Sequence, residues 1–557
     1  MPDVKFDRYY RHDELVSFLY GYAQEFPDLV QLDVIGSSFE GRDIHLVTVT
    51  NKRTGAHQDK PAFWCDGNIH ASEVSASSAV LHILHTLTGK YGKDEQITRA
   101  LDTRTFYLLP RVNPDGAEWA LADQPKIIRS STRPYPYDEE DFYGLEREDI
   151  DGDGRVLSIR VVDPNGGWKV SSSEPRLMER RAPDEFGGTY YRIIPEGVFH
   201  NYDPLTLRGR RVKEGLDLNR NFPSAWRLEH EQYGAGPYPT SEPEIRAQVD
   251  AICKRPNICG AVCFHTFSGV HLRPPSRMPD DDIPAEDLWT YQAIGAKAKE
   301  LTGYPAISNF HEFKYHPKEV ITGTFDDWMY EHRGVYAWTT EIWSPQREAG
   351  ITDYKYIEWF REHPFEHDVQ MLKWSDEKLD GKGYVNWYPF DHPQLGKVEI
   401  GGWDVQLAWR NPPPQFLERE IEHFVDWVVW QAMITPKLEI STVDVKASGD
   451  TTVIRFAIDN SGWLPTYVSK MGLNHKLCRG VVGEISVSEG VELIAGKLRE
   501  EGPQLEGRCY LPSAGFGWMM NATDHRHVFE WTVRGHGVVT VAAKHDRAGR
   551  VSTEVNV

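Results

Sequence analysis

Three apolar, strand-like runs of this chain end on ionisable residues or carry one, although a buried strand rarely holds a charge. His70 and Glu73 follow the first run, and His265 follows the second. Glu341 stands inside the third, where a carboxylate without a partner costs free energy. The carboxyl ends of strands meet along one edge of an open α/β sheet, so these distant positions are expected to converge. The chain is therefore constrained to a sheet of buried strands joined by helices.

Local periodicity supports this alternation of strands and helices. Short apolar runs bounded by turn residues predict strands, including residues 44–49, 63–65, 104–110, 260–264 and 335–343. Apolar residues at helical spacing predict helices, including residues 74–87, 241–254, 287–302, 324–332 and a last long one at 415–434. Strands that alternate with helices indicate an α/β fold class.

The chain has 557 residues, which is too long for one ordinary core. We predict a catalytic domain over residues 1–434, with an insertion at about 126–212 where periodicity weakens and Gly, Pro and polar residues accumulate. From residue 435 the sequence pattern changes to short segments of alternating apolar and polar residues, separated by Gly, Ser, Asn and Asp. Residues 435–557 are therefore expected to form an antiparallel β-sandwich domain.

The charge of the chain narrows the classes of partner. Its 62 Lys and Arg face 83 Asp and Glu, a formal net charge of −21, which argues against nucleic acid or an anionic membrane. No apolar run approaches membrane-spanning length. The first residues lack a basic segment followed by an apolar one, so a cytoplasmic protein is expected.

The residues at the strand ends have the chemistry of a zinc centre. Catalytic zinc takes three protein ligands, and His70, Glu73 and His265 supply two imidazoles and a carboxylate. Zinc lowers the pKa of its bound water and polarises a carbonyl group. Glu341 is then expected to take the proton of that water and pass it to a leaving amine.

A second cation site is suggested within the insertion. Asp149, Asp151 and Asp153 stand at the first, third and fifth positions of a calcium loop, and Gly154 takes the sixth. The twelfth position is Arg160, where a bidentate acid belongs. A bound Ca²⁺ is one interpretation, and an Asp-Gly turn that opens a strand is the other.

Taken together, these motifs resemble the zinc carboxypeptidases of the carboxypeptidase A and B type, from about Tyr9 to Ile434 apart from the insertion. The stretches that carry the resemblance are residues 36–42, His70-Ala71-Ser72-Glu73, Asn113-Pro114-Asp115-Gly116, Asp217-Leu218-Asn219-Arg220-Asn221, His265-Thr266-Phe267-Ser268, Asp326-Asp327-Trp328 and Glu341. The resemblance implies a mixed eight-stranded sheet in an α/β/α sandwich. It also implies one catalytic Zn²⁺ on His70, Glu73 and His265, with Glu341 as general base and acid.

The resemblance further implies how substrate is held. Asn219 and Arg220 would bind the C-terminal carboxylate, which suits the fork of a guanidinium. Arg129 would stabilise the tetrahedral oxyanion, with Arg133 as the alternative. Asp326 matches the position that carries aspartate in members preferring C-terminal Lys or Arg. It would otherwise be an acid that the dipole of its helix favours.

One further residue is expected behind the metal ligands. The ring nitrogen of His70 that does not face the metal needs an acceptor, and Asp217 would supply it.

Two departures from the family pattern concern the grip on substrate. Ser72 replaces the arginine inside the His-to-Glu motif, which removes a subsite contact. The position of the family's mobile, substrate-capping tyrosine falls near Lys318 and Glu319, whereas Tyr315 is close but not aligned.

The sequence therefore predicts a zinc metallocarboxypeptidase that acts on a peptide or small amide with a free C-terminal carboxylate. An alternative is a zinc amidohydrolase acting on a small acylated or isopeptide-linked amino acid, such as a peptidoglycan fragment. A catalytically silent peptide-binding protein is the third reading, which the intact ligand set and Glu341 disfavour.

Overall fold

The computed structural model describes residues 1–557 except 137–142, 208, 210–212 and 516–521. Its centre is a sheet of eight strands. In spatial order they are β1 (Val30–Ser37), β2 (Asp43–Val49), β4 (Thr105–Leu109), β3 (Ala62–Gly67), β11 (Ile258–Thr266), β14 (Tyr336–Ile342), β12 (Val270–Arg273) and β13 (Ala306–Ser308). The four inner strands β4, β3, β11 and β14 run parallel to one another. On either side, β2 runs antiparallel to β4 and β12 runs antiparallel to β14. The predicted mixed eight-stranded sheet is confirmed.

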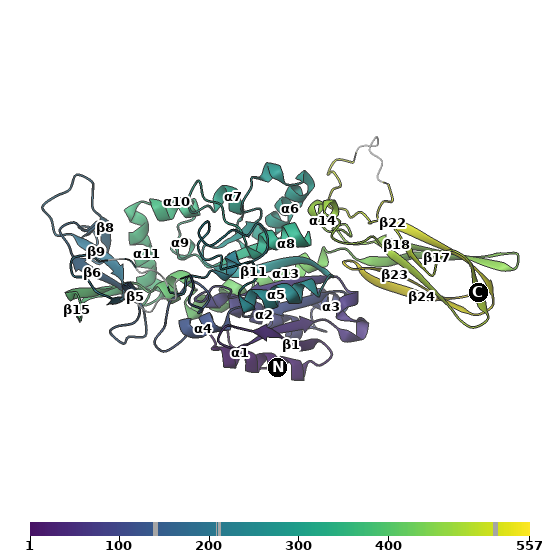
Figure 1. Ribbon diagram of the computed structural model, residues 1–557, viewed down its shortest axis with the longest axis horizontal. Coiled ribbons are helices and arrows are strands. Elements are labelled where there is room, and N and C mark those ends of the chain that lie inside the picture. Colours follow the sequence, from purple (N-terminus) through teal and green to yellow (C-terminus); the bar gives the residue numbers. More distant parts are fainter. Residues whose placement is uncertain (137–142, 208, 210–212, 516–521) are drawn as a thin grey trace.

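Helices cover both faces of this sheet. Every residue of β3 and β11 is buried, although the side chains of a strand alternate between the two faces. The helices α2 (Val74–Lys90) and α13 (Phe424–Met433) pack on β3 and β11, α8 (Phe325–Arg333) packs on β11 and β14, and α5 (Pro243–Cys253) packs on β1. The α/β/α sandwich is thus confirmed (Figure 1). The other long helices are α1 (His12–Glu25), α3 (Glu95–Thr103), α6 (Ala285–Thr302) and α11 (Phe365–Lys378).

The prediction of one long helix over residues 415–434 is wrong. The chain forms α12 (Pro414–Ile421) and then α13, with a turn at Glu422 and His423. Both helices pack on α2, and the second also packs on the sheet and on α6. The helix is therefore interrupted at Glu422 and His423 while the apolar spacing continues.

The insertion contributes strands to a sheet that is separate from the central one. Its strands β6 (Ser158–Val162), β7 (Trp168–Val170), β8 (Met178–Arg180) and β9 (Tyr191–Pro195) join β15 (Tyr384–His392) and β16 (Gly396–Trp403) in a six-stranded sheet. Two further strands, β5 (Gly144–Arg147) and β10 (Gly197–His200), pair with each other. The sequence pattern missed the contribution of residues 384–403. Residues 137–142, 208 and 210–212 of the predicted insertion lie outside the described part.

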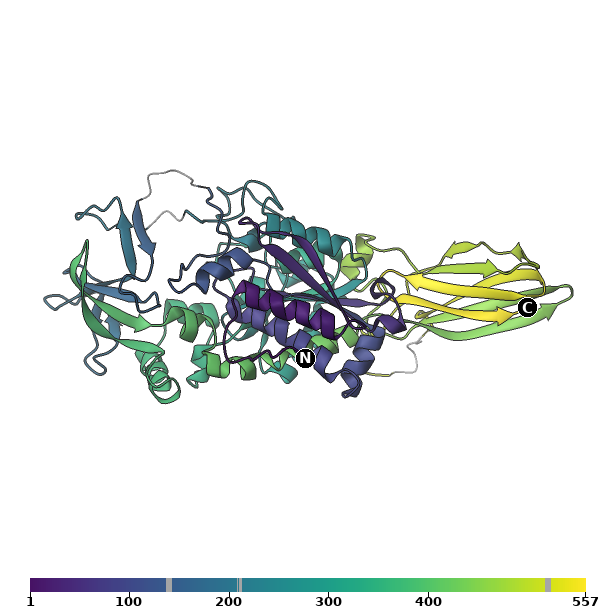
Figure 2. The same cartoon turned by 90° about the horizontal axis from the view of Figure 1, so that it is seen from below.

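The C-terminal region is an antiparallel sandwich, as predicted. One sheet has the order β17 (Leu438–Ser448), β18 (Thr451–Asn460), β22 (Arg526–Gly535) and β20 (Val491–Ala495). The other has the order β21 (Arg499–Glu501), β19 (Val482–Val487), β23 (Val538–His545) and β24 (Gly549–Asn556). The side chains between the sheets form a core separate from that of the central sheet. Figure 2 shows the sandwich at one end of an elongated molecule and the insertion sheet at the other.

Specific hydrogen bonds attach the sandwich to the central body. Asp287 on α6 accepts the backbone N–H groups of Lys470 and Met471 at 2.7 and 2.9 Å. Arg547 donates to the carbonyl oxygen of Gly334, which ends α8, at 3.2 Å. Among the described residues, no helix has the length and apolar character needed to cross a membrane.

Candidate active site

The three parallel strands β3, β11 and β14 bring the predicted residues to one edge of the sheet. His265 and Glu341 are register partners on the neighbouring strands β11 and β14. His70 and Glu73 lie in the turn between β3 and α2. This turn begins at Asn68, which has a φ of 60° and donates its Nδ2 hydrogen to the carbonyl oxygen of His70 at 2.7 Å. The side-chain amide therefore fixes the corner from which both residues project.

His70, Glu73 and His265 face one another in a buried cluster. The Nδ1 atoms of the two imidazoles lie 3.1 Å apart. The carboxylate oxygens of Glu73 lie 2.9 Å from Nδ1 of His70 and 3.2 Å from Nδ1 of His265. All three ligand atoms lie within 4.8 Å of one another. Two nitrogens and a carboxylate at this spacing match the donor set that zinc prefers, so these residues fit the metal that the sequence implies.

The other nitrogen of each imidazole is also engaged. His70 Nε2 lies 3.0 Å from Asp217 Oδ1, and His265 Nε2 lies 3.1 Å from Cys263 Sγ. When Nε2 of His70 carries the proton that Asp217 accepts, its Nδ1 is left with a free lone pair. Asp217 therefore lies where the sequence analysis placed it and fixes the tautomer that a metal requires.

Buried charges in the cluster stabilise one another. Burial raises the pKa of Glu73, but the imidazoles of His70 and His265 outweigh that effect and hold it well below its usual range. Burial also raises the pKa of Asp217, but the charges of Arg129 and Arg220 outweigh that effect and hold it well below its usual range. Burial lowers the pKa of His265. These effects favour the ionised form of Glu73 and disfavour the charged form of His265, in the direction that metal binding requires.

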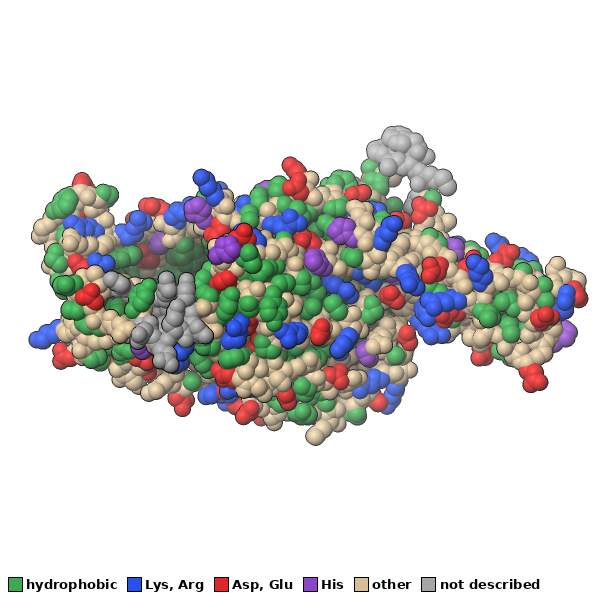
Figure 3. All heavy atoms as spheres, in the orientation of Figure 1, with side chains coloured by type: hydrophobic (Ala, Val, Ile, Leu, Met, Phe, Trp, Pro, Cys, Tyr) green, Lys and Arg blue, Asp and Glu red, His purple; other side chains and the backbone are tan. Residues whose placement is uncertain are grey.

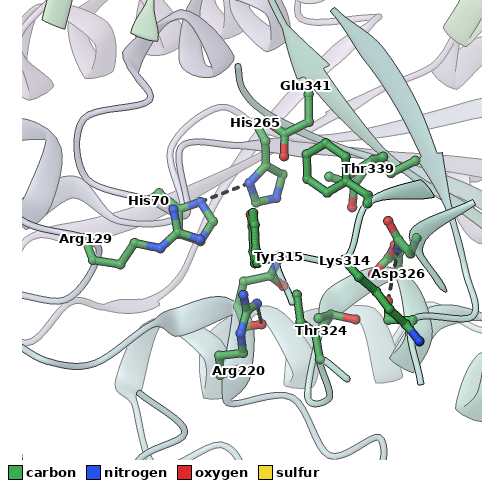
Figure 4. A pocket seen from close by; sticks show the side chains of 16 residues that line it. His70, Arg129, Arg220, His265, Lys314, Tyr315, Thr324, Asp326, Thr339 and Glu341 are labelled. Atoms are coloured by element: carbon green, nitrogen blue, oxygen red, sulfur yellow. Dashed lines mark hydrogen bonds between the residues drawn. The ribbon is translucent and has the colours of Figure 1, made fainter. Parts of the chain in front are cut away.

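Glu341 stands beside this cluster with an unused oxygen. Its residue surface is 9 % exposed, and Oε2 is buried without a hydrogen-bond partner among the described residues. Burial raises the pKa of Glu341 well above its ordinary range, and the nearby charge of Glu73 adds to this. In Figure 4 the carboxylate lies next to the imidazole of His265. Such a carboxylate has the properties of a proton-transfer group.

The structure distinguishes between the two candidate arginines of the oxyanion site. Arg129 Nε donates to Asp217 Oδ2 at 2.9 Å, its Nη1 lies 3.5 Å from Glu73 Oε1, and its side chain remains 39 % exposed to the cleft. Arg133 instead forms two hydrogen bonds with the buried Glu242, at 2.9 and 2.6 Å. Arg129 therefore lines the site together with His70, whereas Arg133 is used in a structural ion pair.

Asn219 and Arg220 line the same pocket as the metal cluster. They belong to the short helix η3 (Leu218–Arg220), where the side chain of Asp217 accepts the N–H of Asn219. Asn219 Oδ1 accepts the backbone N–H of Phe325 at 2.9 Å, which ties η3 to the start of α8. The guanidinium of Arg220 donates to the carbonyl oxygen of Asn219 at 2.8 Å and is 13 % exposed. Figure 4 shows it across the pocket from Glu341.

Asp326 lies in the first turn of α8 and forms part of the same wall. It is buried, and its oxygens accept hydrogen bonds from Asn309 Nδ2 at 2.8 Å and from the N–H of Asp327 at 3.0 Å. Lys314 also lines this pocket, and its ammonium lies 3.2 Å from the ring centroid of Phe310. The pocket, of about 60 Å³, is therefore lined by both an acidic and a cationic side chain (Figure 4). We call it the leaving-group pocket.

Three residues that line the site were not predicted from the sequence as site residues. Tyr315 lines the leaving-group pocket beside Arg129 and Glu341, and its side chain is 54 % exposed. It lies three to four residues before Lys318 and Glu319, where the family pattern places the capping tyrosine. Lys314 precedes it in the same loop. Arg410 lines the cleft from a segment that carries no motif, so no sequence signal pointed to it.

A second pocket of about 470 Å³ adjoins the cluster. His70, Arg129, Tyr315 and Glu341 line both pockets, and Glu73 lines this one, so the two pockets meet at the candidate metal site. Its far wall is aromatic and basic, and consists of Phe267, Tyr356, Phe360, Arg361 and Arg410. We call it the aromatic pocket. The space-filling view shows a hollow on the face between the insertion sheet and the central body (Figure 3).

The calcium interpretation gains no support from the arrangement of the loop. Ligand atoms of Asp149, Asp151 and Asp153 lie within 4.8 Å of one another. Both oxygens of Asp149, however, accept backbone N–H groups of the loop itself, at 2.7 and 2.8 Å. Asp153 pairs with Arg155 at 2.6 Å. These contacts are those of a self-satisfied Asp-Gly turn, the other interpretation of the sequence.

We therefore expect calcium to leave the stability of the protein unchanged. Addition of 1 mM Ca²⁺ would raise Tm by several degrees if this loop bound it with micromolar affinity, roughly as mass action requires. The measurement is a thermal unfolding curve with and without Ca²⁺, with Mg²⁺ as the control cation. A rise specific to Ca²⁺ that Asp151→Asn removes would show that the loop is a calcium site.

The fold and the cluster together define a metallohydrolase of the α/β class. A profile described as zinc carboxypeptidase matches residues 15–189 and 193–364, which is more than half of the chain. The chain belongs to the zinc carboxypeptidase family. A second profile, for a domain of unknown function, DUF8731, matches residues 437–556.

Individual relatives are of modest similarity. Carboxypeptidase B of Astacus astacus is 25 % identical over 339 residues, which cover 60 % of this chain and 86 % of the relative. Carboxypeptidase A2 of Rattus norvegicus is 29 % identical over 346 residues, and that of Mus musculus is 37 % identical over 347. Each alignment with carboxypeptidase A2 covers 61 % of this chain and 64 % of the relative. The similarity thus spans less than two thirds of these two relatives.

Proposed function

We propose that the protein is a zinc metallocarboxypeptidase that hydrolyses the last peptide bond of a substrate with a free C-terminal carboxylate. The proposal rests on the observation that one pocket is lined both by metal-binding and proton-transfer residues and by residues suited to bind a carboxylate. His70 and His265 of the metal cluster, the base Glu341 and the carboxylate-binding pair Asn219 and Arg220 all line it. A site that combines these groups fits a scissile bond one residue from a terminal carboxylate.

The residues divide the reaction between them. Zinc held by His70, Glu73 and His265 would supply Lewis acidity toward the scissile carbonyl. Arg220, with Asn219 beside it, would bind the terminal carboxylate through the fork of its guanidinium.

Two further groups would act on the bond itself. Arg129, held by Asp217 with part of its guanidinium open to the cleft, would stabilise the negative charge that develops on the carbonyl oxygen. Glu341 would take a proton from the attacking water and deliver it to the leaving amine.

A pair of peptides tests this proposal. The two have the same sequence, one with a free C-terminal carboxylate and one with a C-terminal amide, and mass spectrometry follows each digest. We expect the loss of one residue from the free acid and no loss from the amide. Equal loss from both peptides, or internal cleavage, would contradict the carboxylate requirement. Cleavage of a small N-acyl amino acid but of neither peptide would favour the amidohydrolase alternative.

Asp326 predicts a preference for a basic C-terminal residue. Its carboxylate lies in the wall of the leaving-group pocket, and a charge-assisted hydrogen bond to a Lys or Arg side chain favours such a residue by roughly tenfold or more. We therefore expect C-terminal Lys and Arg to be released before Leu and Phe from a peptide library analysed by mass spectrometry. Asp326→Asn is expected to abolish this order while Ala is still released.

Lys314 offers a matched variant in the same pocket. Its ammonium repels a basic side chain, so Lys314→Met is expected to increase the release of Lys and Arg several-fold. Removal of aliphatic residues by the wild type as fast as Lys would exclude a role for Asp326 in specificity.

A further inference from the structure

We propose that Arg410 binds the acyl part of the substrate and selects a carboxylate on the residue that precedes the scissile bond. This inference rests on the proposed peptidase function and adds a substrate class to it. Arg410 lies beyond residues 15–189 and 193–364, the part of the chain that the zinc carboxypeptidase profile matches.

Arg410 is brought to the site by a segment fixed against the metal-binding turn. It ends the short π-helical turn η5 (Val405–Arg410), which Asp404 caps through the N–H of Leu407 at 2.8 Å. The side chains of Gln406 and Asn411 both donate to the carbonyl oxygen of Ser72, at 3.1 and 2.8 Å. The backbone of the turn is thus held without any help from the guanidinium of Arg410.

The guanidinium itself is left with unused hydrogen-bonding capacity. Nη1 donates to the hydroxyl of Ser72 at 2.7 Å. Nε is buried and has no hydrogen-bond partner among the described residues. Within the same described part of the chain, no carboxylate forms an ion pair with Arg410, although the charge of Glu73 acts on it from farther away. A buried donor without an acceptor costs free energy, and a bound carboxylate would satisfy it.

The surroundings of Arg410 show which part of a substrate reaches it. The leaving-group pocket contains Arg220 and Asp326 and takes the terminal residue. The aromatic pocket adjoins the leaving-group pocket at the metal cluster, where the two share His70 and Glu341, and neither Arg220 nor Asp326 lines it. A peptide whose last residue fills the first pocket therefore extends its acyl part into the second.

The charge of the aromatic pocket favours an acidic side chain. Arg129, Arg361 and Arg410 line it, whereas its two acids, Glu73 and Glu341, belong to the metal cluster and to proton transfer. The side chains of Tyr356 and Phe360 from α10 (Tyr356–Arg361) form its apolar wall. A volume of about 470 Å³ accommodates more than one residue. The pocket thus matches an acyl segment with an apolar stem and an anionic end.

The test compares two peptides that differ only in the penultimate residue, Glu or Gln, with the same C-terminal residue. We expect the wild type to favour the Glu peptide in kcat/KM by about tenfold, the scale of one charge-assisted hydrogen bond. Arg410→Gln is expected to bring the ratio of the two kcat/KM values close to one. Ser72→Ala, which removes the hydroxyl partner but keeps the guanidinium, should retain the preference and the zinc content.

The outcomes separate this inference from the function on which it rests. A wild-type ratio of one, with both peptides cleaved, overturns the role of Arg410 and leaves the carboxypeptidase proposal intact. An equal loss of zinc in Arg410→Gln and Ser72→Ala would also overturn the role of Arg410 in substrate binding, because Arg410 would then only stabilise the metal-binding turn. Cleavage of neither peptide, in a protein that holds zinc, overturns the proposed function itself. A wild-type ratio of one overturns the inference even if Arg410→Gln does not fold.

Discussion

Glu341→Gln is expected to abolish turnover while the protein keeps its zinc. Glutamine has nearly the same size and shape as glutamate but cannot accept the proton of the attacking water. Loss of a positioned general base lowers kcat by roughly 10²–10⁴-fold. The carboxylate of Glu341 has an oxygen without a hydrogen-bond partner among the described residues, so the substitution breaks no bond at that atom. Metal analysis and kcat, measured on the same preparation, check both parts.

Glu341→Asp serves as the matched control for this prediction. It retains a carboxylate but withdraws it from the cleft, so its activity should fall between those of the wild type and Glu341→Gln. Turnover of Glu341→Gln within a few-fold of the wild type would remove Glu341 from the mechanism. Loss of zinc in this variant would show instead that Glu341 supports the metal site.

The second large effect is expected at Arg220. Arg220→Ala should lower kcat/KM by roughly 10²-fold or more, because a bidentate, charge-assisted contact with the terminal carboxylate is lost from a largely buried site. Arg220→Lys keeps the charge without the fork and should recover only part of the loss. Steady-state kinetics on one free-acid peptide give the comparison.

Arg133→Lys provides a second arginine substitution outside the pocket. Lysine would pair with the buried Glu242 through an ammonium rather than a fork, but Arg133 lies outside the pocket, so we expect kcat/KM to change little. An equal loss in Arg133→Lys and Arg220→Ala would mean that the effect follows from general destabilisation. A KM for the free-acid peptide that does not change in Arg220→Ala would contradict carboxylate binding.

The sheet and the metal cluster were predictable because each rests on local patterns. Apolar runs that stop at His70 and His265 indicate strand ends, and parallel strands bring such ends together whatever the length of chain between them. Glu341 could be predicted as a functional residue because a carboxylate in an apolar strand costs free energy when it has no partner.

The remaining features depend on contacts that no local pattern encodes. The resemblance already favoured Arg129 over Arg133, but the structural reason, the pairing of Arg133 with Glu242 more than a hundred residues away, could not be predicted. The six-stranded sheet combines strands of the insertion with strands from residues 384–403, and no local pattern shows that these two distant segments pair. Arg410 reaches Ser72 through the fold only, so the guanidinium near this position could not be predicted from the His-to-Glu motif.

The central claim is that His70, Glu73 and His265 hold one zinc on which hydrolysis depends. It is tested most directly by removing metal with a chelator and titrating zinc back while the release of the C-terminal residue is measured. We predict that the metal-free protein is inactive, that activity rises linearly with zinc and levels off at about one equivalent per chain, and that His265→Ala does not recover. Full activity of the metal-free protein, or a zinc-loaded wild type that releases no residue, would contradict the account.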